Sequence, residues 1–284
     1  MNFQKRIKAQ VRPVARSILQ RALHDRPLTN QMMAEWACHK GWRPPPQGVE
    51  TEAYIDASFG YDDEANIKKA VSVIKRNTMV SFERLATLWL QVQHLDKYEI
   101  VGDLVECGVW RGGSAGMMAL AHLYSRPNTS RHLHLFDSWQ GLPEPDRELD
   151  GALAVKYSGG ANRGALEPIG QCVAALDEVR QLLEREIGYP AERIHYHVGW
   201  FQETLARTQV EKIALLRLDG DWYESTKICL EELYPRVVKG GIIVLDDYGY
   251  WSGCRKATDE FIEQLSEPVM LHHIDVDGRY FVKP

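Results

Sequence analysis

Cysteine is scarce in this sequence. There are five in 284 residues, at positions 38, 107, 172, 229 and 254, and no two of them form a C-x-x-C pair. An odd number of scattered cysteines argues against a disulfide framework and against a structural zinc site. Because free thiols persist in a reducing compartment, we expect a cytoplasmic protein.

Long hydrophobic runs and an excess of positive charge are also lacking. No apolar stretch approaches the roughly 18 residues that a membrane span needs, and the first residues lack the apolar core and cleavage site of a secretion signal. The formal net charge is −5, whereas nucleic-acid binding favours a basic footprint. We therefore expect a globular protein with no membrane span and no nucleic acid as partner.

Residues 1–24 have the pattern of an appended amphipathic helix. Apolar residues recur at helical spacing, and the segment holds six Lys or Arg residues and no acid. Such a helix either lies on a membrane surface or a partner, or packs on the protein's own body or a second subunit. Pro13 disturbs a long free helix and favours packing. We place residues 1–60 in a helical and irregular N-terminal extension and residues 61–284 in the main domain.

From about residue 102, short apolar runs alternate with helical stretches. The runs are GDLVECG, RHLHLFD, RIHYHVG, IALLRLD and GIIVLDD, and helical candidates lie near 113–125, 168–187, 201–208, 224–234 and 255–265. Such alternation is typical of βαβ units and a parallel sheet. Two more runs flank Asp277-Gly278, a dipeptide typical of a β-hairpin. The sequence predicts an α/β fold with a doubly wound, seven-stranded, mostly parallel sheet, preceded by helices over 62–97 with Ser81 as an N-cap.

Four of the five apolar runs end in an acid. The acids are Glu106, Asp137, the pair Asp219 and Asp221, and the pair Asp246 and Asp247. In open parallel sheets, ligands bind outside the carboxyl ends of the strands. One acid at such a position is more often a helix N-cap, but four strands that end alike predict a functional rim.

The first run leads into a glycine-rich loop, ECGVWRGGS, over residues 106–114. Glycine allows a tight turn and a close approach of the backbone to a ligand. The loop lacks the G-x-G-x-x-G of nicotinamide-dependent oxidoreductases. Asp137, at the end of the second run, suits a ribose diol because a carboxylate accepts hydrogen bonds from both hydroxyls.

Asp219, Asp246 and Asp247 would repel one another if their carboxylates met at one rim. A hard cation relieves that repulsion, and magnesium prefers oxygen ligands while it keeps waters that a substrate oxygen can replace. The sequence thus favours a magnesium site. The alternative is that Asp246 caps the next turn and Asp219 pairs with an arginine.

Five motifs in this order resemble those of the macrocin O-methyltransferase family. They are LVECGVWRGGS, LFDSWQGLPEPD, VGWFQETL, LRLDGDWYEST and LDDYGYWSGCRKATDEF, and the resemblance covers most of residues 76–265. It implies a class I methyltransferase fold, S-adenosylmethionine and magnesium as cofactors, and methyl transfer to a hydroxyl of a natural product, usually on a deoxysugar. Two features depart from the family. Trp139 stands where phenylalanine is common, and residues 150–165 form an unfamiliar glycine-rich segment that we expect to be a mobile lid.

The resemblance also implies roles for individual residues. It places Glu106, Gly108 and Ser114 at the methionine part of the cofactor, Asp137 at the ribose, Ser138, Gly199 and Trp200 at the adenine side, and Thr78 and Met79 in a segment that closes over it. It assigns Asp219, Asp246 and Asp247 to magnesium. The expected partners are a small-molecule acceptor and further copies of the chain, in a homo-oligomer.

The reaction needs a base that takes the proton of the acceptor hydroxyl. We favour Asp221 over Asp219, because a carboxylate bound to a metal is a weaker base. The alternative for Asp221 is a cap on the helix that begins near Glu224. Two rival functions stay open, a catechol-type O-methyltransferase acting on an aromatic diol and a non-catalytic cofactor-binding scaffold. A scaffold is expected to lose its metal acids, and all three are present.

Overall fold

The computed structural model describes residues 59–126 and 131–284. The helix expected over residues 1–24, and nearly all of the N-terminal extension, lie outside this part and stay predictions. No helix in the described ranges is long and apolar enough to cross a membrane.

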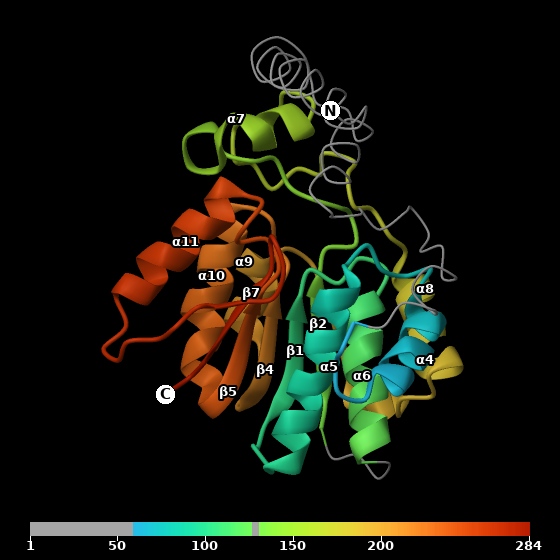
Figure 1. Ribbon diagram of the computed structural model, residues 1–284. Coiled ribbons are helices and arrows are strands. Elements are labelled where there is room, and N and C mark those ends of the chain that lie inside the picture. The colour runs from blue at the N-terminus through green and yellow to red at the C-terminus, as the bar shows by residue number, and fades with distance from the viewer. Residues whose placement is uncertain (1–58, 127–130) are drawn as a thin grey trace, which may run out of the picture. The chain divides into compact units, whose positions relative to one another are not determined.

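In the part of the chain that the structure describes, seven strands form one sheet in the order β3-β2-β1-β4-β5-β7-β6 (Figure 1). Strands β1 to β5 pair in parallel, β7 runs antiparallel to β5, and β6 runs antiparallel to β7. The strands are β1 (Asp103–Cys107), β2 (Leu133–Asp137), β3 (Ile194–Val198), β4 (Ile213–Leu218), β5 (Val237–Leu245), β6 (His272–His273) and β7 (Arg279–Val282). The predicted doubly wound sheet with a closing hairpin is confirmed.

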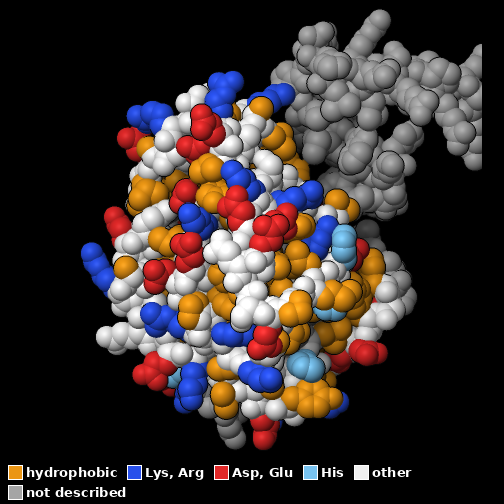
Figure 2. All heavy atoms as spheres, turned by 90° about the vertical axis from the view of Figure 1, so that its left-hand side faces the viewer, with side chains coloured by type: hydrophobic (Ala, Val, Ile, Leu, Met, Phe, Trp, Pro, Cys, Tyr) orange, Lys and Arg blue, Asp and Glu red, His pale blue; other side chains and the backbone are white. Residues whose placement is uncertain are grey.

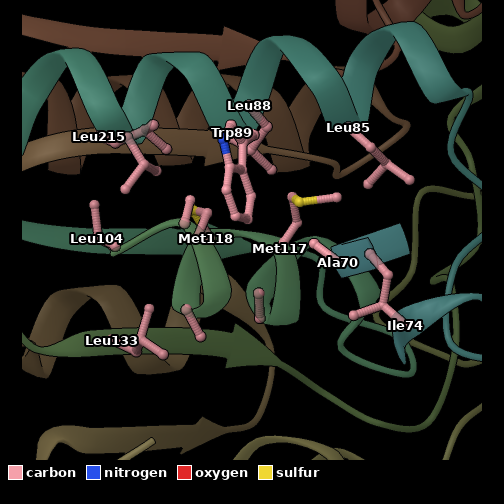
Figure 3. Packing of buried hydrophobic residues seen from close by; sticks show 14 of the residues in the cluster. Ala70, Ile74, Leu85, Leu88, Trp89, Leu104, Met117, Met118, Leu133 and Leu215 are labelled. Carbon is pink, nitrogen blue, oxygen red and sulfur yellow. The ribbon is translucent and has the colours of Figure 1, made fainter. Parts of the chain in front are cut away.

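One face of the sheet is covered by α4 (Glu64–Ile74), α5 (Phe82–Lys97) and α6 (Gly113–Ser125). Figure 3 shows side chains of α5 and α6 packed together with those of β1, β2 and β4, namely Leu88, Trp89, Met117, Met118, Leu104, Leu133 and Leu215. Burial of such a side chain stabilises the fold by about 1.5–3 kcal/mol. The hydroxyl of Ser81 accepts the N–H of Arg84 at 3.2 Å and caps α5, as predicted.

The other face is covered by α9 (Phe201–Thr204), α10 (Tyr223–Leu233) and α11 (Ser252–Glu263). Successive strand residues point to opposite faces. Leu104 and Leu215 therefore lie in the first core, whereas their neighbours Val105 and Leu216 lie in the second. Burial on both faces explains why the central strands are continuous apolar runs.

The chain between β2 and β3 differs most from the prediction. It contains α7 (Arg147–Tyr157), which the sequence pattern does not predict, and the helix expected over 168–187 begins only at α8 (Leu176–Arg180), followed by a π-helical turn (Gln181–Glu186). Gly151, at φ 80° and ψ 179°, interrupts α7 and breaks its periodicity. Half of the expected glycine-rich lid is thus helical. Short 3-10 turns lie at Ala191–Arg193, Leu205–Arg207 and Tyr234–Arg236.

Candidate active site

The carboxyl ends of β1, β4 and β5 meet near the middle of the sheet. Strand β1 has β2 on one side and β4 on the other, so the chain reverses its direction of winding there. Ligands of open α/β sheets bind at this position. Glu106 lies in β1, Asp219 follows β4, and Asp246 follows β5, so all three reach the same edge.

The loop after β1 is fixed by Gly108 and Asp137. Gly108 has φ 88°, and a Cβ there would lie 1.8 Å from the carbonyl oxygen of Asp219, so only glycine lets this loop lie against the end of β4. Asp137 Oδ2 accepts the N–H groups of Val109 at 2.7 Å and Trp110 at 2.9 Å, and its Oδ1 accepts the N–H of Trp139 at 2.6 Å. The N–H of Ser138 adds a further hydrogen bond, so the backbone holds this carboxylate firmly at the end of β2.

The segment before α5 lies directly on the first turn of α6. A Cβ at Gly113 would lie 2.5 Å from both the carbonyl oxygen of Asn77 and the Cβ of Thr78. Thr78 and Ser114 are buried, whereas Met79 is 55 % exposed. This arrangement puts Met79 at the surface beside the glycine loop.

Ser138, Gly199 and Trp200 lie beyond the ends of β2 and β3. The hydroxyl of Ser138 accepts the N–H of Gln140 at 3.1 Å and donates to the carbonyl of Gly141 at 3.2 Å, so it closes its own turn. The N–H of Gly199 donates to the carbonyl of Asp137 at 3.0 Å. Trp200 is half-buried at the start of α9. These residues therefore border the same end of the sheet as Asp137.

A buried arginine joins the acids of three strands. Arg217 Nη1 lies 2.6 Å from Glu106 Oε1, and Nη2 lies 3.0 Å from Asp219 Oδ2 and 2.6 Å from Asp246 Oδ1. The sequence analysis missed this residue. Its signal is visible in IALLRL, where it is the only charged side chain of a buried strand, and buried charges are paired.

The second oxygen of Glu106 has no hydrogen-bond partner among the described residues, although it is buried. Burial raises the pKa of Glu106 to about 8, Arg217 opposes that rise, and the nearby charge of Asp219 adds to it. An unpaired buried carboxylate oxygen is costly unless a donor or a cation reaches it. The ammonium group of a bound amino acid fits this requirement.

Asp246 is held by a second arginine from outside the sheet. Arg84 of α5 forms an ion pair with Asp246, and it also pairs with Asp275 at 2.8 Å and with Asp277 at 3.3 Å. The described residues thus place Asp246 between Arg84 and Arg217. Arg84 carries no local sequence signal, because its partners lie more than 160 residues away.

The carboxylates that meet are those of Asp219, Asp221 and Asp247, whose oxygens lie within 4.8 Å of one another. Burial and repulsion between the three raise the pKa of Asp221 and Asp247 well above the usual value. Burial also raises the pKa of Asp219, although Arg217 lowers it. The sequence predicts Asp219, Asp246 and Asp247 as the metal ligands. The structure brings Asp219 and Asp247 together, and the third carboxylate of this cluster is that of Asp221 rather than Asp246. The alternative in which Asp219 pairs with an arginine is also observed.

Asp221 does not cap α10, because the N-cap residue of that helix is Trp222 and the N–H of its first residue, Tyr223, donates to Asp150 instead. Its Oδ1 accepts the indole N–H of Trp251 at 2.6 Å, and its own backbone N–H donates to Asp247 Oδ2 at 3.2 Å. The residue has φ 57°, a left-handed conformation that costs energy outside glycine and clusters at functional sites. The cap alternative is therefore wrong, and the carboxylate faces the acid cluster.

Aromatic rings enclose Asp221 on the side away from the sheet. Trp251 lies 4.8 Å from Trp222, 5.4 Å from Tyr157 and 4.6 Å from Tyr250, measured between ring centroids. Tyr157 and Tyr250 are 37 % and 40 % exposed, so they offer open ring surface next to the acids.

The expected lid is anchored to the body of the domain at Asp150. The buried Asp150 carboxylate accepts the N–H of Tyr223, the first residue of α10, at 2.7 Å. The backbone carbonyl of Asp150 accepts the hydroxyl of Ser252, the first residue of α11, at 2.8 Å. The anchor brings Tyr157, the last residue of α7, against Trp222 and Trp251.

Comparison with known proteins identifies the family of this domain. Residues 58–283 match the macrocin O-methyltransferase family, TylF. The chain is 34% identical over 204 residues to 8-demethyl-8-(2,3-dimethoxy-alpha-L-rhamnosyl)-tetracenomycin-C 4'-O-methyltransferase of Streptomyces olivaceus. The aligned residues cover 71% of this chain and 73% of the relative. It is 34% identical over 205 residues to demethyldecarbamoylnovobiocin O-methyltransferase of Streptomyces niveus, covering 72% and 75%.

Among solved structures, the O-methyltransferase NovP superposes with a TM-score of 0.63 at 32% sequence identity, covering 73% of this chain and 82% of that one. The family match spans nearly all of the described domain and includes the glycine loop, the acid cluster, Arg84 and the buried Arg217. The chain therefore belongs to the macrocin O-methyltransferase family and is an S-adenosylmethionine-dependent O-methyltransferase.

Proposed function

We propose that this enzyme methylates a hydroxyl of a sugar on a glycosylated natural product, with magnesium at Asp219 and Asp247 and with Asp221 beside it as the base. The observation that carries the proposal is the convergence of these three carboxylates within 4.8 Å, beside the unpaired oxygen of Glu106. Relatives at 34% identity act on a rhamnosyl tetracenomycin and on a novobiocin precursor.

In this proposal the cofactor lies over the glycine loop. Glu106 Oε2 accepts its ammonium group, and Gly108 and Ser114 adjoin the methionine part. Asp137, fixed at the end of β2, takes the ribose. Ser138, Gly199 and Trp200 border the adenine. Thr78 and Met79, in the segment that lies on the first turn of α6, close over the cofactor.

The donor set suits magnesium, because the carboxylates of Asp219 and Asp247 supply only oxygen atoms and hard cations prefer them. The raised pKa values of Asp221 and Asp247 reflect a repulsion that a cation would remove. Magnesium bound there would polarise an acceptor hydroxyl and lower its pKa. Arg84 and Arg217 hold Asp246 beside the cluster, where it is the fourth acid available as a ligand.

Asp221 is the proposed base. The indole of Trp251 fixes one of its oxygens at 2.6 Å, which leaves the other to accept the proton of the acceptor hydroxyl. Because Asp221 itself does not bind the metal in this proposal, it keeps its strength as a base. Tyr157 and Tyr250 line the space for the acceptor, and their exposed ring faces suit the apolar face of a sugar or an aglycone.

The test uses matched acceptors. The enzyme is incubated with S-adenosylmethionine and a rhamnosylated aromatic polyketide, its aglycone, or a simple catechol, and the methylated position is read by fragment mass spectrometry. The proposal expects methylation of the sugar in the glycoside alone. Turnover of the catechol at an equal rate would favour the aromatic-diol alternative, and cofactor binding without turnover of any acceptor would favour the scaffold.

We further propose that the enzyme works in the cytoplasm as a homo-oligomer. The cysteines of the described ranges, Cys107, Cys172, Cys229 and Cys254, are free thiols, which suits a reducing compartment. Light scattering of the purified chain tests the oligomer, and a monomer mass at micromolar concentration would contradict it.

A further inference from the structure

The surface along α11 carries a hollow that the chemistry at the acid cluster does not use. Its volume is about 490 Å³, within the roughly 300–1,000 Å³ of small-molecule sites. Residues 249–252 line it, together with side chains that recur every three to four residues and so share one face of α11. These side chains are Arg255, Lys256, Asp259, Glu260 and Glu263. We call this feature the α11 hollow.

The α11 hollow begins beside the acid cluster. Trp251 lines it, and the indole N–H of the same residue holds Asp221 Oδ1 at 2.6 Å. Tyr250 also lines it, is 40 % exposed, and has its ring centroid 4.6 Å from that of Trp251. An acceptor whose reacting hydroxyl reaches Asp221 therefore has the hollow within reach of its next group.

Two carboxylates of the hollow are held by tyrosine hydroxyls. The hydroxyl of Tyr223 donates to Glu260 Oε2 at 2.5 Å, and the hydroxyl of Tyr248 donates to Asp259 Oδ1 at 2.8 Å. Both carboxylates are partly exposed. Their second oxygens have no hydrogen-bond partner among the described residues. Each carboxylate thus offers an acceptor atom in a fixed position.

Two cations of the hollow supply donors in the same way. Arg255 Nε donates to the carbonyl of Tyr248 at 3.2 Å, and the guanidinium lies over the ring of Tyr248, 5.2 Å from its centroid. Both Nη groups of Arg255 have no partner in the part of the chain that the structure describes. Lys256 Nζ lies over the ring of Tyr223 at 5.2 Å. Both cations are exposed, so their donors face solvent.

This lining suits an uncharged ring that is rich in hydroxyl groups. A hydroxyl both donates and accepts, so it can bond to a carboxylate oxygen and to a cationic nitrogen at once. Two cations and three carboxylates nearly balance in charge, and Figure 2 shows basic and acidic side chains mixed on the side that carries α11. An apolar group would instead remove water from these charges at a cost. The open ring of Tyr250 suits the C–H face of a sugar.

We propose that the α11 hollow binds a second sugar ring of the acceptor, linked to the sugar that is methylated. The inference rests on the proposed function, because it takes the methylated sugar to lie at the acid cluster. Tyr250 stands between the two rings, and Arg255, Lys256 and the fixed carboxylates bond to the hydroxyls of the second. A hydrogen bond to a charged group tightens binding by about 10–150-fold.

The experiment compares two acceptors by calorimetry with S-adenosylhomocysteine and Mg²⁺ present. One is a rhamnosylated aromatic polyketide. The other carries a second rhamnose on a hydroxyl of the first that the enzyme does not methylate. We expect the diglycoside to bind at least about tenfold more tightly. Arg255→Met and Lys256→Met should each bring the ratio of the two Kd values towards one.

The matched control is Lys227→Met. Lys227 Nζ lies over the same ring of Tyr223 at 5.6 Å but lies outside the hollow, so this variant should keep the wild-type ratio. Equal Kd values in the wild type, a preference that survives both Arg255→Met and Lys256→Met, or failure of both acceptors to bind would overturn the inference. Binding of both acceptors without methylation would contradict the proposed function, while the ratio would still decide on the hollow. Circular dichroism separates lost binding from lost folding.

Discussion

Replacement of Glu106 by glutamine should weaken cofactor binding and abolish a proton release that accompanies it. Glu106 is 1 % exposed, one oxygen pairs with Arg217 at 2.6 Å, and the other has no partner among the described residues. Burial raises its pKa from 4.5 to about 8. At pH 7, about nine in ten free chains therefore carry a proton on this group.

The cofactor ammonium at the unpaired oxygen favours the ionised carboxylate. Binding at pH 7 should thus release about 0.9 proton, and affinity should rise by up to about tenfold per pH unit below pH 8. In the free enzyme, the raised pKa means that the folded state favours the protonated carboxyl group. The stability that Glu106 contributes is therefore complete below pH 4.5 and is lost as the pH rises to 8. A hydrogen bond to a charged group contributes about 1.5–3 kcal/mol, so Glu106→Gln should lower affinity by about 10–150-fold.

The assay is calorimetric titration of S-adenosylmethionine at pH 7 in two buffers of different ionisation enthalpy. The difference in heat between the buffers gives the number of protons released. Glu99→Gln is the control, because its side chain is 80% exposed and pairs only at the surface with Arg126. Equal heats in both buffers for the wild type, or wild-type affinity in Glu106→Gln, would refute the assignment of Glu106.

Three further predictions follow from single contacts. Asp221→Asn should lower kcat by about 10²–10⁴-fold, the usual contribution of a general base, with the Kd for S-adenosylmethionine unchanged; wild-type turnover would rule this base out. Gly113→Ala should weaken cofactor binding, because its Cβ would lie 2.5 Å from the Cβ of Thr78; an unchanged Kd would count against that segment. For His197, burial first and the nearby histidines next lower the pKa to about 4. Its stability contribution is complete above pH 6.5 and is lost as the pH falls to 4, by about 1 kcal/mol after allowance for partial exposure. Urea unfolding of the wild type and His197→Gln measures this, and equal losses in both would contradict it.

Local sequence pattern accounts for the strands and for the edge at which the acids gather. A parallel strand covered on both faces is a nearly continuous apolar run, so IALLRL and GIIVL predict β4 and β5 directly. The acids after them then share one edge by topology alone. Helix α7 does not follow the apolar periodicity of a helix, because Gly151 changes the chain direction within it. The anchor at Asp150 depends on contacts with residues 73 and 102 positions later in the chain.

The exact grouping of carboxylates does not follow from local pattern. Asp246 and Asp247 are neighbours in the chain, yet one lies between Arg84 and Arg217 and the other meets Asp219 and Asp221. Arg84 lies 162 residues from Asp246, so no short motif reports their contact. The sequence correctly favours acids at this rim, but long-range ion pairs decide which of them face one another.

Metal dependence of turnover tests the central claim most directly. The enzyme is stripped with EDTA, dialysed, and titrated with Mg²⁺ in the presence of S-adenosylmethionine and a glycosylated acceptor. The carboxylate cluster at Asp219, Asp221 and Asp247 predicts no turnover in the stripped enzyme and saturable recovery with Mg²⁺, and Asp219→Asn should shift that recovery to higher concentrations. Full turnover of the stripped wild type would contradict a magnesium site at these acids.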